Sequence, residues 1–184
     1  QIKSHYPDSR FIIIVRDPRD VSLSWSQTPW NKNKTSLFHA LYFRKNLKYI
    51  LKIKETYGED IYIIRYEDVI TNTKNEIQNL CKFISIDFED SMLTSRRKTN
   101  LFDSKEEPWK SNVLNSIDQN NHSKWQKNMS KIEARIIQEL NLPFITKFNY
   151  KLEKGNLVFL CFNNFFKLLF IVFKTIISVI QHKK

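Results

Sequence analysis

The chain has 184 residues, which is enough for one domain with its own hydrophobic core. Hydrophobic residues make up 41% of it, which excludes an intrinsically disordered protein, and the two cysteines, Cys81 and Cys161, exclude a disulfide framework. The 30 Lys and Arg residues exceed the 19 Asp and Glu residues, and the net charge of +11 indicates an anionic partner: a phosphate ligand, a nucleic acid, an acidic substrate or an anionic membrane surface.

The first predicted strand is Phe11–Val15, a continuous apolar run that is β-branched at its centre. Such a run is typical of a strand buried on both faces of a parallel sheet that helices cover. A helix should begin directly after it, because the Asp17 carboxylate can accept from the amides of the first turn and Pro18 needs no amide there. The acidic side chain of Asp20 interacts favourably with the helix dipole in the first turn and can complete a reciprocal cap. In open α/β sheets, ligands bind at this kind of junction.

Arg16 stands at this junction between strand and helix. A single arginine in such a place usually lies on the surface beside an Asp. A phosphate site is favoured here because the preceding strand is too apolar for a sheet edge, the helix is well capped, and Ser24 follows two helical turns later. A guanidinium binds phosphate through paired N–H bonds, and a hydroxyl adds a third donor. Arg19 is the competing candidate, and we expect it to point away and to lie on the surface.

The middle of the chain predicts a helix, a strand and a second helix. Leucine and isoleucine recur at helical spacing over 37–57, with lysines on a face that we interpret as solvated, and Gly58 ends this helix. Residues 61–64 predict a second buried strand, which ends in the polar run Arg-Tyr-Glu-Asp at 65–68. Residues 71–88 then have the pattern of an amphipathic helix, in which Cys81 is a small core residue.

A long polar segment precedes the last helix of the predicted domain. Residues 93–119 have weak periodicity, and a loop of this length is typical of a functional or a disordered segment. The basic residues at 96–98 could line the path of an acidic substrate, but a solvated charge cluster is the simpler interpretation. Ser130 and Glu133 form a capping box that predicts a helix directly after them.

The carboxyl-terminal segment 157–180 is strongly apolar, yet its longest unbroken apolar run, 168–173, is far shorter than the roughly 18 residues of a spanning helix. The interruptions fall near one line of a helix: Asn163, Lys167, Lys174, Ser178 and Gln181. Such a helix can lie in a membrane interface, with its lysines reaching anionic headgroups. The alternative is that its apolar face packs on the domain. The many phenylalanines favour the membrane, and we divide the chain into a domain over 1–152 and a tail helix over 153–184.

The stretch "VRDPRDVSLSW" resembles a motif of sulfotransferases that use 3′-phosphoadenosine 5′-phosphosulfate (PAPS). In that family an Arg at the strand end and a Ser eight residues later hold the 3′-phosphate of the nucleotide, so the resemblance gives this role to Arg16 and Ser24. "IYIIRYEDVI" resembles the family's second block, which places Tyr66 near the adenosine end. A core tyrosine, hydrogen-bonded at the sheet edge, is an equal alternative for Tyr66.

A third resemblance lies at Ser123-Lys124-Trp125, which is similar to a segment of the family best known in protein-tyrosine sulfotransferases. It implies that Lys124 lies near the phosphates of the nucleotide. The match is partial, because Asn121 stands where the family often has a serine, and Asn115 stands where it has a basic residue.

The resemblance covers about 6–150 and implies an α/β fold: a parallel sheet flanked by helices, as in P-loop nucleotide folds. The family's phosphate loop and catalytic base precede these motifs, and neither Gly58 nor Gly155 lies in such a loop. We therefore expect the chain to be the carboxyl-terminal part of a longer enzyme and to be inactive alone. Its catalytic base is unknown and is expected upstream of residue 1.

The implied reaction is sulfuryl transfer from PAPS to a hydroxyl or amine of a carbohydrate, a protein tyrosine or a small molecule, without a metal. We expect a cytoplasmic protein, peripheral to a membrane if the tail helix binds one. Two alternatives remain: a catalytically incomplete, membrane-associated interaction protein, and a basic nucleic-acid-binding module. No nucleic acid is expected as a partner, because the lysines are spread over several segments and no recognised nucleic-acid motif occurs.

Overall fold

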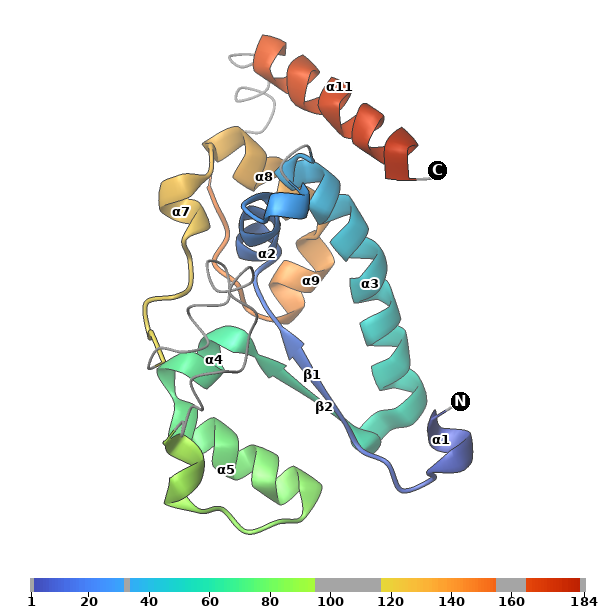
Figure 1. Ribbon diagram of the computed structural model, residues 1–184, viewed down its shortest axis with the longest axis vertical. Coiled ribbons are helices and arrows are strands. Elements are labelled where there is room, and N and C mark those ends of the chain that lie inside the picture. Colours follow the sequence, from blue (N-terminus) through green and yellow to red (C-terminus); the bar gives the residue numbers. More distant parts are fainter. Residues whose placement is uncertain (1, 32–33, 95–116, 155–164, 183–184) are drawn as a thin grey trace. The chain divides into compact units, whose positions relative to one another are not determined.

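The structure, a computed structural model, describes residues 2–31, 34–94, 117–154 and 165–182 (Figure 1). The chain forms two compact units. Unit 1 comprises Gln1–Val15 and Ile53–His122, and unit 2 comprises Arg16–Lys52 and Ser123–Lys184. The positions of the two units relative to each other are not determined.

Unit 1 contains a small parallel sheet, as the two apolar runs predict. Strand β1 (Phe11–Val15) pairs with β2 (Ile61–Arg65), and the register sets Phe11 opposite Ile61 and Val15 opposite Arg65. Ile12 and Ile14 share one face of β1 and are 43% and 64% exposed. The prediction that β1 is buried on both faces is therefore wrong. An unbroken apolar run lacks the alternation that would have marked the open face.

In unit 1, the helices α4 (Tyr66–Thr71) and α5 (Thr73–Ile84) both contact β2. Unit 1 also contains α1 (Ile2–His5), η2 (Gly58–Asp60) and η3 (Asp90–Leu93). Cys81 on α5 is a buried free thiol, which confirms its core role, and its sulfur lies 3.6 Å from that of Met92. Arg10 donates to the Phe83 carbonyl and to the Ser85 hydroxyl, so the segment before β1 is tied to the end of α5.

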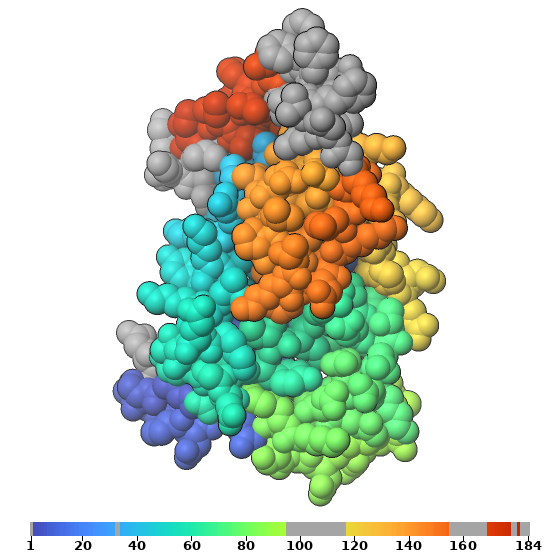
Figure 2. Space-filling view, turned by 180° about the vertical axis from the view of Figure 1, so that it is seen from behind, coloured from blue at the N-terminus to red at the C-terminus, as the bar shows by residue number. Residues whose placement is uncertain are grey.

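Unit 2 is helical. Its elements are α2 (Pro18–Ser26), η1 (Pro29–Asn31), most of α3 (Ser36–Tyr57), α7 (Trp125–Asn128), α8 (Lys131–Leu140), α9 (Leu142–Lys147) and α11 (Phe165–His182). One core cluster joins three of these helices through Leu37, Ala40, Ile137 and Ile171. The α8 and α9 surface is orange in Figure 2, and part of α11 is red. The apolar positions of α3 and α8 thus meet as their helical spacing predicts.

The predicted helix caps are confirmed at two places. The Asp17 carboxylate accepts from the amide of Arg19 at 2.9 Å, and Pro18 opens α2. The Ser130 hydroxyl accepts from the amide of Glu133 at 3.4 Å and donates to the Glu133 carboxylate at 2.7 Å. Both helices therefore begin where the sequence marks them.

Two predictions fall wholly or partly outside the described residues. Most of the predicted 93–119 loop lies outside them. Of the tail helix predicted over 153–184, residues 153–154 are described and are not helical, residues 155–164 lie outside the described part, and α11 begins at Phe165. Within the described part of the chain, no helix combines the length and the apolar character that crossing a membrane requires.

Candidate phosphate-binding site

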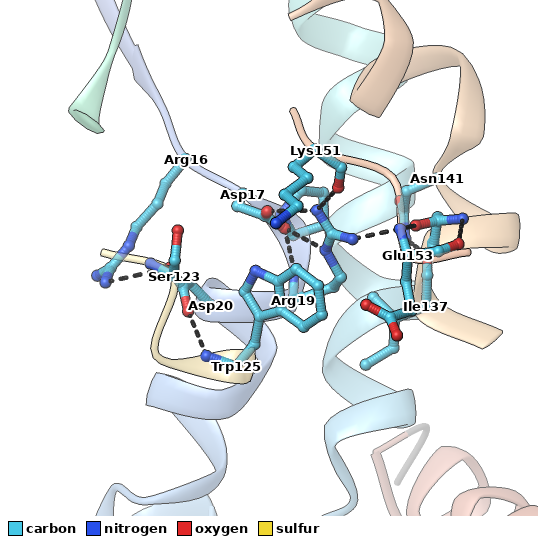
Figure 3. A network of polar contacts seen from close by, with 12 residues as sticks. Arg16, Asp17, Arg19, Asp20, Ser123, Trp125, Ile137, Asn141, Lys151 and Glu153 are labelled. Carbon is cyan, nitrogen blue, oxygen red and sulfur yellow. Dashed lines mark hydrogen bonds and ion pairs between the residues drawn. The ribbon is translucent and has the colours of Figure 1, made fainter. Parts of the chain in front are cut away.

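Arg16 follows the last residue of β1 and precedes α2, as the sequence indicates (Figure 3). Its side chain is 21% exposed, and its Nη2 atom lies 3.9 Å from Oδ2 of Asp20. The guanidinium thus has a carboxylate neighbour on one side and remains partly open to solvent. A cation placed in this way can accept an anionic ligand without leaving its protein partner.

Asp20 connects the start of α2 to a segment more than 100 residues away. Its Oδ2 accepts from the amide of Ser123 at 2.6 Å, and its Oδ1 accepts from the amide of Trp125 at 2.9 Å. The side chain is 1% exposed, and burial raises the pKa of its carboxyl, against the lowering effects of the Trp125 amide and the Arg16 charge. Both oxygens therefore bind distant amides, and the reciprocal cap expected for Asp20 stays a prediction.

This clamp positions Lys124, which stands between the two amides that Asp20 binds. The side chain of Lys124 is exposed. The structure therefore holds Arg16 and the backbone around Lys124 through one carboxylate. Asp20 thus contacts both Arg16 and the backbone on either side of Lys124.

Arg19 is fully buried, so the prediction that it lies on the surface is wrong. Its guanidinium forms a paired contact with Asp17, with Nε to Oδ1 at 2.9 Å and Nη2 to Oδ2 at 2.6 Å. It also donates to the Gln138 side chain at 3.1 Å and to the Lys151 carbonyl at 2.7 Å (Figure 3). A buried guanidinium with its donors used in this way is a structural group and is not available to a ligand.

Arg19 also fixes the segment that contains Lys124, because its guanidinium lies 3.8 Å from the ring centre of Trp125. Trp125 is thus held at its amide by Asp20 and at its ring by Arg19. Sequence reasoning did not identify Asp20 and Arg19 as the residues that position this segment. A local signal for them is absent, since their partners lie over 100 residues away in the chain.

Ser24 lies in the second half of α2, and its side chain is exposed. Its neighbour Ser22 is buried and donates to the Pro18 carbonyl at 2.7 Å, so of these two serines Ser24 is the one open to a ligand. Positions 16 and 24 are separated by about two helical turns, roughly 12 Å of rise. Arg16 must therefore extend along α2 if one anion is to contact both side chains.

Tyr66 is the first residue of α4, directly after β2, and it belongs to unit 1. Its hydroxyl accepts from the Asn121 side-chain amide at 2.8 Å. Asn121 is the residue that stands where the resemblance expects a serine. The structure thus gives Tyr66 a polar partner on the segment that leads to Lys124, and its role toward a nucleotide stays a prediction.

The chemistry of the described residues is that of anion binding. Arg16, Lys124 and Ser24 supply two cations and a hydroxyl, which can bind and neutralise an anion. Among the residues that the structure describes, no three His, Cys, Asp or Glu side chains are grouped to hold a metal ion.

Comparisons with known proteins concern the family and the fold of the chain. Residues 1–90 match the model of the sulfotransferase family. Among solved structures, the chain is similar to the "Sulfotransferase Domain from the Curacin Biosynthetic Pathway", with a TM-score of 0.66 and 20% identity, and the match covers 79% of this chain. The chain spans 55% of the length of that domain. No curated protein matches the chain.

Proposed function

We propose that this chain, whose residues 1–90 match the sulfotransferase family model, serves sulfuryl transfer from PAPS to a hydroxyl or amine acceptor. The observation that carries the proposal is the partly open Arg16 guanidinium at the carboxyl end of β1. This is the edge of a parallel sheet where ligands of α/β proteins bind. The α/β fold with its small parallel sheet supports the same assignment.

In this proposal the 3′-phosphate of the nucleotide lies between Arg16 and Ser24. Arg16 supplies paired N–H donors, and Ser24 supplies a hydroxyl on the solvent side of α2. Lys124 adds positive charge from the segment that Asp20 holds. Tyr66 is proposed at the adenosine end, with its hydroxyl oriented by Asn121.

These residues bind and orient the donor, and the donor supplies the activated sulfuryl group. Transfer of such a group needs positioning and neutralisation of negative charge more than covalent help from the protein, by analogy with phosphoryl transfer. The exposed cations of unit 2 suit that task. Neither the catalytic base nor the loop that would hold the 5′-phosphosulfate is assigned to a residue of this chain.

The chain spans 55% of the length of the sulfotransferase domain that it resembles. Completion of the catalytic site by a further segment is therefore part of the proposal, and so is the relation to P-loop nucleotide folds. We expect no turnover from residues 1–184 alone. Transfer from a labelled donor by this chain, lost in Arg16→Ala, would contradict that expectation.

Calorimetry with adenosine 3′,5′-bisphosphate tests the binding site in the full-length protein. Arg16→Ala should weaken binding by about 2–4 kcal/mol, which is roughly 30- to 1000-fold in Kd, because a charged phosphate contact is lost. Ser24→Ala should cost about 1 kcal/mol. Arg10→Ala is the matched control, since Arg10 is an exposed arginine that bonds to the end of α5. Equal affinity in wild type and Arg16→Ala would remove Arg16 from the site.

A further inference from the structure

Helix α11 packs on unit 2 through one narrow face. Ile171 and Thr175 are 7% and 5% exposed, and they are spaced four residues apart on the same side of the helix. Ile171 joins the core cluster with Leu37 and Ile137, and the Thr175 hydroxyl lies 2.8 Å from that of Thr35. These contacts fix which side of α11 faces inward.

The opposite side of α11 is apolar and exposed. At about 100° per residue, Phe173 and Ile180 point roughly opposite to Ile171 and Thr175. The large apolar side chains of this face are 38–63% exposed. They form the outer patch: Leu169, Phe170, Val172, Phe173, Ile176, Ile177 and Ile180. A contiguous patch of this kind on one helix exceeds the scattered exposed apolar residues of an ordinary surface.

A groove extends the outer patch toward the core of unit 2. It has a volume of about 390 Å³ and lies between α3, α8 and α11. Its lining is Leu37, Leu41, Ile136, Leu140, Val172, Thr175, Ile176 and Ile180. Because Val172, Ile176 and Ile180 also belong to the outer patch, one continuous apolar surface runs from the outside of α11 into the groove. Apolar chains can therefore contact α11 both on its outer face and beside it.

The charge next to the outer patch points to the kind of partner. Lys174 is exposed, and its ammonium lies 5.5 Å from the ring centre of Phe170, so its stem lies along the patch while its charge reaches water. The chain has a net charge of +11. An apolar helix face with a cation at its margin matches the boundary between acyl chains and anionic headgroups of a bilayer.

We propose that the outer patch of α11 lies in the interface of an anionic membrane. Phe173 and Ile180 enter the acyl boundary, while Lys174 contacts the headgroups. The inner face stays on unit 2 through Ile171 and Thr175, so the membrane holds the unit without removing α11 from it. This proposal does not depend on nucleotide binding, because it is drawn from residues outside the phosphate site.

Cosedimentation of the full chain with lipid vesicles tests the proposal. Wild type should bind phosphatidylcholine vesicles that contain phosphatidylserine more tightly than vesicles of phosphatidylcholine alone. The double variant Phe173→Asp/Ile180→Asp should reduce binding at least tenfold, because it places two carboxylates on the face that enters the acyl boundary. Tyr49→Asp is the matched control: Tyr49 is an exposed aromatic residue of α3 outside the outer patch, and its variant should bind as wild type does.

A second variant tests the electrostatic part. Lys174→Gln should lower the preference for anionic vesicles by about fivefold, since one lysine near the surface contributes about that factor, and added salt should weaken the preference further. Thermal unfolding of each variant checks that unit 2 is intact.

Three results would overturn the proposal. The first is equal vesicle binding by wild type and the folded double variant. The second is unfolding of the double variant together with unchanged anionic preference in Lys174→Gln. The third is a dimer that forms without vesicles and is lost in the double variant, which would make the outer patch a contact between copies. Nucleotide calorimetry on the same preparations shows separately whether the phosphate site is intact.

Discussion

Truncation of Asp20 to alanine should destabilise unit 2 strongly, because it removes the acceptor of two amides. The amides of Ser123 and Trp125 donate to its oxygens at 2.6 and 2.9 Å, and Trp125 is buried. Hydrogen bonds to a charged group contribute about 1.5–3 kcal/mol each, so the two bonds together contribute about 3–6 kcal/mol. Burial raises the pKa of the Asp20 carboxyl, which means that holding its charge inside the protein costs part of this sum.

We therefore expect Asp20→Ala to lower the free energy of unfolding by about 2–4 kcal/mol. Urea unfolding at pH 7, followed by far-ultraviolet circular dichroism, measures this quantity. Asp68→Ala is the matched control, since Asp68 is 43% exposed and its nearest cation, Arg65, lies 3.6 Å away. Its loss should cost less than about 1 kcal/mol. If Asp20→Ala destabilised the chain no more than Asp68→Ala, the 123–125 segment would not be held by this carboxylate.

Two further predictions concern buried ionisable groups of unit 2. Burial, followed by the charge of Lys34, lowers the pKa of His39 from 6.5 to about 4. Between these values the unfolded chain binds a proton that the folded chain does not, so the free energy of unfolding should fall by up to about 3 kcal/mol as pH decreases from 6.5 to 4. In urea titrations His39→Phe should lack this fall. The same pH dependence in wild type and His39→Phe would refute the role of His39. Arg19→Leu should lower the free energy of unfolding by about 3–5 kcal/mol, because it leaves the Asp17 carboxylate buried without its cation. Replacing Asp17 by Asn in the same chain should restore part of that loss, and a cost of Arg19→Leu below about 1 kcal/mol in urea unfolding would contradict the buried pair.

The elements of the fold were predictable because their signals are local. The apolar run of β1, the Asp17 cap and the Ser130 cap each involve residues within a few positions of one another. Exposure was not predictable in the same way. Ile14 is as apolar as a core residue, yet it is 64% exposed, because burial depends on which elements lie over a face and not on the strand's own residues.

The places of Arg16 and Ser24 in the fold, after the strand and two turns into α2, were predictable from local sequence, and their role toward a phosphate stays a prediction. The groups that hold the site together were not. The roles of Asp20 and Arg19 depend on partners 103 to 132 residues away, so no spacing within α2 could reveal them. Arg19 was expected to point away from the helix start and to lie on the surface, because its long-range partners, Gln138 and Lys151, are visible only in the folded chain.

The Arg19 contacts also set a limit on when unit 2 can fold during synthesis. The guanidinium reaches its full set of partners only when the Lys151 carbonyl is present, 132 residues after Arg19. At about 5–20 residues per second, a ribosome needs roughly 7–26 s to make that stretch. During this interval α2 can form its local cap. The charge of Arg19 keeps α2 in contact with water until the distant partners of the guanidinium have been synthesised. Unit 2 should therefore fold late, when its carboxyl-terminal segments pack on α2.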